Sequence, residues 1–295
     1  MVDPAIVVGV DGSRSSLDAV RWATCEATAR KTPLQLLSCI TYRGTDDGPG
    51  LADILHERAE RDLAEALEIA RAVSGEADLG IRVELSHQNA PGSLVDRSSG
   101  AAMVVLGRRG LGEFTDGLIG SVTSAVARHA QCPVAVIDGW SRVAHGTGPV
   151  IVGVDGSANS EQAIGLAFEE CSLHRAKLIA LHAWSDYDLS MLPVAEEQTV
   201  ERSVLEASIA GWSERFPDVA VRETLVRDRP VRHLLEMADD AQMVVVGHRG
   251  RGGFAGLTLG STSAALLHIT PCPLLIARPG RFNQGLTETT GHAAQ

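Results

Sequence analysis

Short apolar runs alternate with longer amphipathic segments along the first half of the chain. The runs IVVGV, LQLLSCI, IRVELSH, MVVLG and VAVI have the length and the β-branched content of strands. Between the first three runs, apolar residues recur every three or four positions, which marks one face of a helix. These helical stripes are Leu17, Val20, Ala23 and Ala27, and then Leu55, Ala59, Leu63, Ala66 and Ala70. Short helices are expected from Gly92 and Gly120, so the pattern predicts buried parallel strands with helices on both faces of the sheet.

The second half of the chain repeats the first in the same order, which indicates a duplication. The matching segments are AIVVGVDGS and VIVGVDGS (5–13 and 150–157), LQLLSCIT and KLIALHAW (34–41 and 177–184), AAMVVLGRRG and AQMVVVGHRG (101–110 and 241–250), and HAQCPVAVI and ITPCPLLIA (129–137 and 269–277). We therefore expect two tandem doubly wound α/β domains at 1–140 and 149–280, each with a five-stranded parallel sheet. GWSRVAHGTGP (139–149) is the expected linker, and the polar residues 281–295 form an expected mobile tail.

Composition narrows the class of protein. Hydrophobic residues make up 44% of the 295 residues and charged residues 21%, as in ordinary soluble globular proteins. The net charge of −11 disfavours nucleic-acid binding, and no apolar run is long enough to cross a membrane. The first residues lack the features of a signal peptide, and the five cysteines lack metal-like spacing. We expect a cytoplasmic protein without nucleic-acid or membrane partners.

The most informative motif is a glycine-rich loop that follows the fourth strand of each half. GRRGLGEFTDGLIGS (107–121) and GHRGRGGFAGLTLGS (247–261) share the spacing G-x2-G-x9-G-S, although the residues between the glycines differ. If the strand order is 3-2-1-4-5, these loops meet Asp11 and Asp155 where the strand order reverses, which is where such sheets bind ligands. Gly120-Ser121 and Gly260-Ser261 then begin helices whose free N–H groups suit a phosphate. The same helix starts include Val122, Thr123, Thr262 and Ser263. The alternative is that these residues are only turn glycines and helix caps.

On these residues the chain resembles tandem universal stress proteins of the ATP-binding subgroup. The nucleotide motif of that family, G-x2-G-x9-G-[S/T], is met by Gly107, Gly110, Gly120 and Ser121, and again by Gly247, Gly250, Gly260 and Ser261. The resemblance implies that Asp11 and Asp155 lie near the ribose and phosphates, and that Ile40 and Ala183 cover the adenine. It also implies the strand order 3-2-1-4-5 and dimers formed through the fifth strands, for which pairing of the two domains within one chain is an alternative.

The remaining chemistry favours a binder over an enzyme. The only lysines, Lys31 and Lys177, are far from both glycine loops, so a Walker A loop is excluded. The loop cations Arg108, Arg109, Arg249 and Arg251 either screen phosphates or are solvated turn charges. No general base for attack on a phosphate can be identified, so we expect ATP binding, with Mg2+, and at most weak hydrolysis. The expected function is regulation in stress adaptation through an unidentified protein partner; a slow ATPase or phosphotransferase and a scaffold without ligand remain alternatives.

Overall fold

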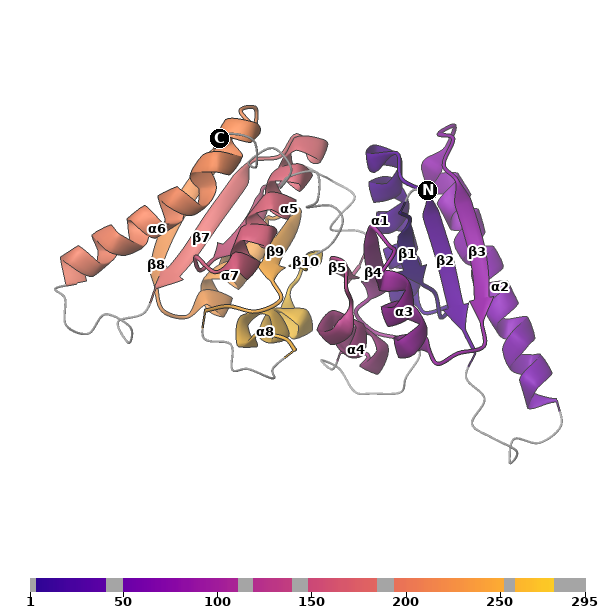
Figure 1. Ribbon diagram of the computed structural model, residues 1–295. Helices are drawn as coiled ribbons and strands as arrows, with labels where there is room; N and C mark the ends of the chain where they lie inside the picture. The colour runs from indigo at the N-terminus through magenta and orange to yellow at the C-terminus, as the bar shows by residue number, and fades with distance from the viewer. Residues whose placement is uncertain are drawn as a thin grey trace, which may run out of the picture. The chain divides into compact units, whose positions relative to one another are not determined.

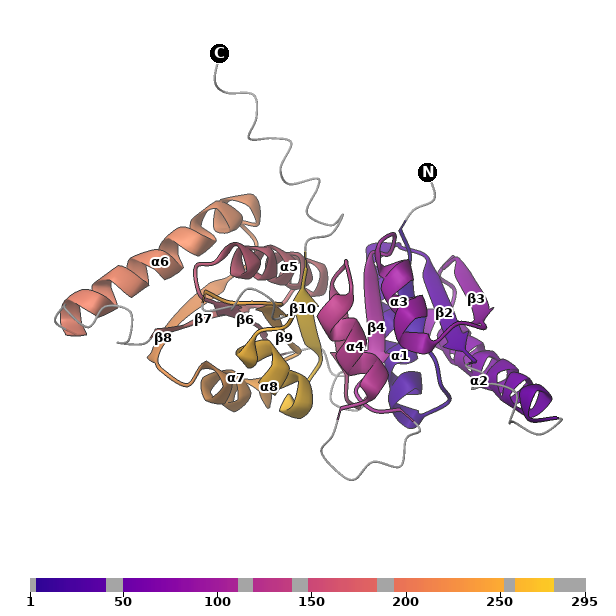
Figure 2. The ribbon, with the colours of Figure 1, turned by 60° about the horizontal axis from the view of Figure 1, so that its bottom comes forward.

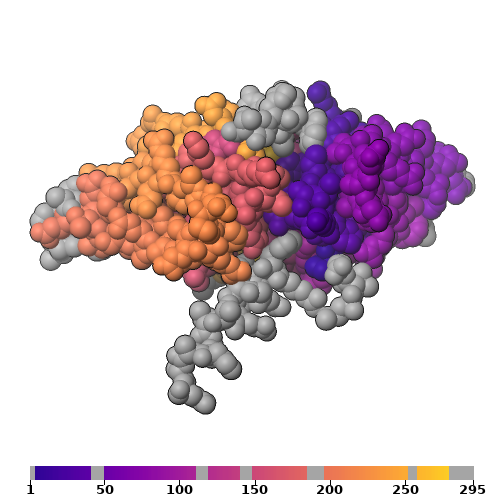
Figure 3. Space-filling view, turned by 90° about the horizontal axis from the view of Figure 1, so that it is seen from above, coloured from indigo at the N-terminus to yellow at the C-terminus, as the bar shows by residue number. Residues whose placement is uncertain are grey.

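The computed structural model describes residues 4–40, 50–110, 119–139, 148–184, 194–251 and 258–278. These residues belong to two compact units, one from each half of the chain. In Figure 3 each unit forms a continuous block of surface, coloured from indigo to magenta for the first and from rose to yellow for the second. No helix among the described residues is long and apolar enough to span a membrane. All five cysteines are free thiols.

The first unit is a parallel five-stranded sheet with helices on both faces (Figure 1). Its strand order is β3-β2-β1-β4-β5. Helix α1 packs against α2 on one face of the sheet, and α3 packs against α4 on the other (Figure 2). The elements are β1 (Ile6–Gly9), α1 (Arg14–Arg30), β2 (Leu34–Cys39), α2 (Leu51–Ser74), β3 (Ile81–Ser86), α3 (Ala90–Ser98), β4 (Met103–Gly107), α4 (Ser121–His129) and β5 (Val134–Ile137).

The second unit has the same topology. Its strand order is β8-β7-β6-β9-β10, with parallel pairing throughout, α5 packed against α6 and α7 packed against α8. The elements are β6 (Val150–Val154), α5 (Ala158–His174), β7 (Leu178–Trp184), α6 (Val194–Arg215), β8 (Val221–Arg227), α7 (Pro230–Ala238), β9 (Met243–Gly247), α8 (Ser261–Ile269) and β10 (Leu274–Ala277). Both units therefore confirm the predicted doubly wound fold and the order 3-2-1-4-5.

Local sequence explains where the helices begin and which faces they bury. Ser13 caps α1 by accepting a hydrogen bond from the amide of Ser16. Helix α3 begins at Ala90, earlier than the expected start at Gly92, because the Asn89 side chain accepts the Gly92 amide hydrogen at 2.8 Å. In the two predicted stripes the later residues are buried, whereas the first residue of each is only half-buried. The helices thus cover the sheet with the faces that the periodicity predicts.

Strand register corrects one equivalence drawn from the sequence. Ile6 and Val150 are counterparts, because each lies three residues before the first glycine of GVDGS in its unit. Ile6 pairs with Leu34 in the first unit, and Val150 pairs with Leu178 in the second. Cys39 is therefore the counterpart of Ala183, and Ile40 is the counterpart of Trp184 rather than of Ala183. The sequence match was one residue out because two apolar runs of similar composition align in either register.

Candidate functional site: a cavity at the carboxyl ends of each sheet

The first unit has a cavity of about 540 Å3 at the carboxyl ends of β1, β2 and β4. It lies at the reversal of strand order, where ligands bind in doubly wound sheets. Ile40 does not line this cavity, whereas its neighbour Cys39 does, in agreement with the corrected register. The predicted residues that line it are Asp11, Gly107, Gly110, Gly120, Ser121, Val122 and Thr123.

The second unit has a matching cavity of about 440 Å3 at the ends of β6, β7 and β9. Every residue predicted for this half lines it, namely Asp155, Ala183, Gly247, Gly250, Gly260, Ser261, Thr262 and Ser263. Trp184, the last residue of β7, also lines the cavity. The two units thus gather the same elements of their repeated motif around a cavity.

A carboxylate at the end of the first strand faces the glycine loop in each unit. Asp11 Oδ1 accepts the Ser13 amide hydrogen at 3.0 Å, and Asp155 Oδ1 accepts that of Ser157 at 2.9 Å. These side chains form turns after the strand, while the serines cap the helices. A Cβ atom on Gly110 or Gly250 would lie 2.5 Å from Oδ2 of the facing aspartate. Glycine at the second position of the loop therefore leaves room for the carboxylate in the position that it has here.

The first glycine of each loop has a packing role that the sequence did not reveal. Gly107 is the last residue of β4, and a Cβ atom there would lie 2.6 Å from the backbone carbonyl carbon of Ser15 in α1. A Cβ atom on Gly247 would lie 2.7 Å from the backbone oxygen of Asn159. Glycine at these positions therefore lets the end of the strand approach the neighbouring helix closely, while both residues also line their cavities.

The helices that follow the glycine loops begin at the cavities without a side-chain cap. Gly120 and Gly260 are the N-cap residues of α4 and α8, and neither cap offers a side-chain hydrogen bond. The first N–H groups of a helix have no partner within the helix, and its dipole makes this end positive. The buried hydroxyls of Thr123 and Ser263 donate to the carbonyl oxygens of Gly107 and Gly247, at 2.8 and 2.6 Å. They hold each helix start against its strand, so the amides and the exposed Ser121 hydroxyl are left to face a ligand.

The loop arginines separate into two groups. The buried Arg108 forms an ion pair with Asp138 at 2.7 Å and does not line the cavity. Arg109 lines the first cavity, and Arg249 and Arg251 line the second. His248 replaces Arg108 in the second unit, also buried. Its pKa is lowered to about 4, mainly because burial disfavours the charged ring and also because cationic arginines lie close by.

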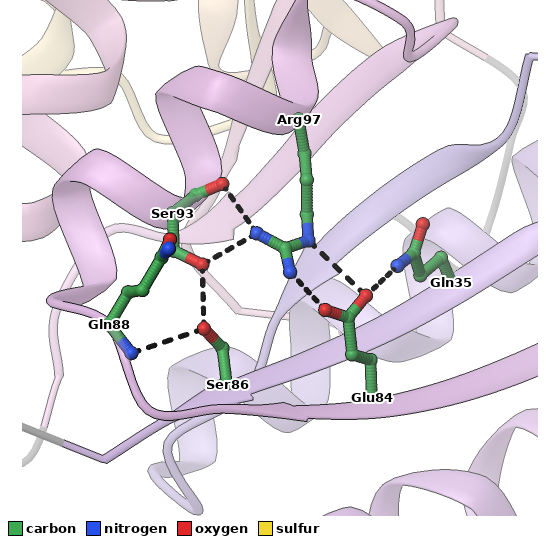
Figure 4. Close-up of polar contacts among 6 residues, drawn as sticks. All are labelled: Gln35, Glu84, Ser86, Gln88, Ser93 and Arg97. Atoms are coloured by element: carbon green, nitrogen blue, oxygen red, sulfur yellow. Dashed lines mark hydrogen bonds and ion pairs between the residues drawn. The ribbon is translucent and has the colours of Figure 1, made fainter.

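A polar network fixes the α3 wall of the first cavity (Figure 4). Arg97 of α3 pairs with Glu84 of β3, and its guanidinium donates to the Ser93 hydroxyl at 2.7 Å. The Ser93 hydroxyl in turn donates to that of Ser86 at 3.1 Å. These bonds tie α3 to the edge of the sheet, next to the Cys39 thiol, whose pKa is raised mainly by burial.

The second cavity contains a buried pair that sequence analysis missed. His182 of β7 and Glu201 of α6 both line the cavity and are almost inaccessible to solvent. His182 Nε2 lies 2.5 Å from Glu201 Oε2, and His182 Nδ1 lies 2.7 Å from the carbonyl oxygen of Val154. The only signal in the sequence is a glutamate on the core-facing side of α6, four residues before the buried Leu205.

Fold and site together define a tandem doubly wound protein with a cavity at the strand-order reversal of each sheet. The sequence profile of the universal stress protein family matches residues 4–138 and 147–278. The chain belongs to the universal stress protein family.

Individual relatives agree with this assignment. Universal stress protein Rv2623 of Mycobacterium tuberculosis is 39% identical over 284 residues, covering 92% of this chain and 96% of the relative. A universal stress protein of Mycolicibacterium smegmatis is 38% identical over 284 residues, covering 93% and 97%. The crystal structure of a universal stress protein from Archaeoglobus fulgidus has a TM-score of 0.72 at 20% identity and covers 94% of this chain and 98% of its own, which supports the fold.

Proposed function

We propose that this protein is an ATP-binding regulator of the universal stress class, with one nucleotide site in each unit. The observation that carries the proposal is the uncapped start of α4 and of α8, which opens into a cavity opposite the carboxylate of Asp11 or Asp155. The free N–H groups and the positive dipole end of such a helix start favour a phosphate there. Both cavity volumes lie in the range of about 300–1,000 Å3 that is typical of small-molecule sites.

The residues that line each cavity suggest where the triphosphate and the base of a nucleotide would lie. The triphosphate would lie on the amides of residues 121–123 or 261–263, with Arg109 or Arg249 nearby. The base would lie at the end of the second strand, against Leu37 and Cys39 in the first cavity and against Ala183 and Trp184 in the second. Mg2+ is usually held by substrate phosphates with one or two carboxylates, and the carboxylates of Asp11 and Asp155 lie against Gly110 and Gly250 of the glycine loops.

The side chains favour binding over hydrolysis. Both lysines lie at the amino ends of the second strands, at the sheet edge opposite the cavities: Lys31 ends α1 before β2, and Lys177 precedes β7. His182 has both ring nitrogens engaged by Val154 and Glu201, so it is not available to accept a proton from water. Phosphoryl transfer requires a positioned nucleophile and charge stabilisation. We therefore propose a binder that signals its nucleotide state to a protein partner, and not an efficient ATPase.

Calorimetry with the purified full chain tests this proposal. ATP with Mg2+ should bind more tightly than adenosine, because adenosine cannot reach the helix starts. Equal affinities would refute the phosphate cradle, and the absence of all nucleotide binding would favour a scaffold without ligand. Rapid release of labelled phosphate from ATP would favour the ATPase.

A further inference from the structure

The two cavities differ in charge next to the turn that follows their first strands. A Cβ atom on Gly12 of the first unit would lie 2.5 Å from the carboxylate of Asp62. A Cβ atom on the equivalent Gly156 of the second unit would lie 2.5 Å from the Arg251 guanidinium. An acidic side chain in one unit is therefore replaced by a basic one in the other. Position 251 follows the second glycine of its loop, where the first loop has Leu111.

Arg251 is held by two interactions, one at its backbone and one at its side chain. Its backbone amide donates to Asp155 Oδ2 at 2.9 Å, and its guanidinium lies 3.7 Å from Glu201 Oε2. Glu201 is in turn fixed by His182, which is anchored to the carbonyl oxygen of Val154. The first unit has Ser38 at the register position of His182, so it lacks this arrangement.

Glu201 orients Arg251 without removing it from the cavity. The same carboxylate oxygen, Glu201 Oε2, lies 2.5 Å from His182 Nε2 and 3.7 Å from the Arg251 guanidinium. Glu201 is buried, whereas the Arg251 side chain is 41% exposed and lines the cavity. The guanidinium can therefore reach a ligand while its ion pair with Glu201 sets its direction.

We propose that Arg251, positioned by Glu201 and His182, makes the second cavity selective for nucleoside triphosphates over monophosphates, whereas the first cavity discriminates much less by phosphate charge. This inference rests on the proposed function, since it requires that both cavities bind nucleotides. A guanidinium adds a directed, charge-assisted bond to a polyphosphate. Asp62 at the equivalent place in the first unit is paired with Arg58 at 3.9 Å and does not line the first cavity, so it offers no such bond.

Calorimetry on full chains with one site blocked tests the inference. Gly120→Asp blocks the first helix start, so that the second site is measured alone, and Gly260→Asp does the reverse. The ratio of the ATP and AMP association constants should be about ten-fold larger at the second site than at the first. In the Gly120→Asp background, Arg251→Gln should bring this ratio down to that of the first site.

Two further variants test the positioning of Arg251 and its specificity. Glu201→Gln can keep a hydrogen bond to His182 through its side-chain amide, but it loses the ion pair with Arg251. A several-fold fall in the ATP-to-AMP ratio would then report the contribution of this ion pair to the position of Arg251. The matched control is Arg249→Gln, because Arg249 has a counterpart in the first unit, Arg109. Arg249→Gln and Arg109→Gln should each weaken ATP binding at their own site. The difference in the ATP-to-AMP ratio between the two sites should persist in both variants.

Two results contradict the inference in distinguishable ways. An unchanged ATP-to-AMP ratio in Arg251→Gln, with both nucleotides still bound, overturns the selectivity and leaves the proposed function standing. Absence of nucleotide binding at either site overturns the proposed function and the selectivity with it.

Discussion

Replacing Gly120 by aspartate should strengthen the fold and weaken ATP binding at the first site. Gly120 is the N-cap of α4, with φ −61° and ψ 143°, a backbone conformation that aspartate adopts readily. An added Cβ atom would have no neighbour closer than 3.5 Å. The new carboxylate would accept the same helix-start amide hydrogens that are proposed to bind phosphate.

The two effects have opposite signs and different sizes. An aspartate cap on a helix dipole stabilises the fold by about 0.5–1 kcal/mol relative to glycine. A carboxylate about 4 Å from a phosphate is repelled by roughly 1 kcal/mol in bulk water and by roughly 4 kcal/mol at a protein surface. The Kd of ATP at this site should therefore rise by about 5-fold to about 1,000-fold.

Thermal unfolding and calorimetry on the same preparation measure both effects. Gly120→Asn is the matched control, because asparagine caps the helix equally well but carries no charge, so its loss of affinity should be smaller. A Gly120→Asp protein with a raised Tm and unchanged ATP affinity would refute the phosphate cradle. A Gly120→Asp protein that unfolds would instead show that Gly120 is required by the fold.

Three further outcomes follow from the packing and the titratable groups. In urea titrations, Gly107→Ala should lower the free energy of unfolding by about 1–3 kcal/mol, because its Cβ atom would collide with the Ser15 backbone. Gly120→Ala should lower the free energy of unfolding less, because its Cβ atom would have no neighbour closer than 3.5 Å. The His248 pKa is lowered to about 4, so the unfolded chain binds a proton between pH 6.5 and 4 that the folded chain does not. Stability should thus fall across that window by up to about 3 kcal/mol, and His248→Gln should remove this loss in urea unfolding at pH 7 and pH 5. Finally, ATP should protect Cys39, which lines the first cavity, from alkylation by N-ethylmaleimide, while the exposed Cys25 of the same unit stays reactive; equal labelling of Cys39 with and without ATP would count against occupancy of that cavity.

Much of the architecture could be predicted because it depends on local periodicity and on a duplication. The apolar runs and helical stripes determine the elements, and the repeated G-x2-G-x9-G-S loop lies where the strand order reverses. Asp11 and Asp155 could be placed at the cavities from the same rule, since each lies within two residues of the end of a first strand.

Other features depend on contacts between distant segments and left little trace in the sequence. The role of Gly107 depends on how closely α1 approaches the end of β4, which no spacing reveals. The pairing of His182 with Glu201 joins a strand to the following helix, and each residue alone resembles an incidental polar residue. The Ile40 equivalence failed because hydrophobicity does not distinguish a register shift of one residue in a buried strand.

Native mass spectrometry of the full chain with saturating ATP and Mg2+ measures whether each unit holds one ATP. Two ATP molecules should bind per wild-type chain, one after Gly120→Asp or Gly260→Asp, and none in the double variant. A wild-type chain that never holds more than one ATP, or two bound ATP molecules in the double variant, would contradict one ATP site in each unit.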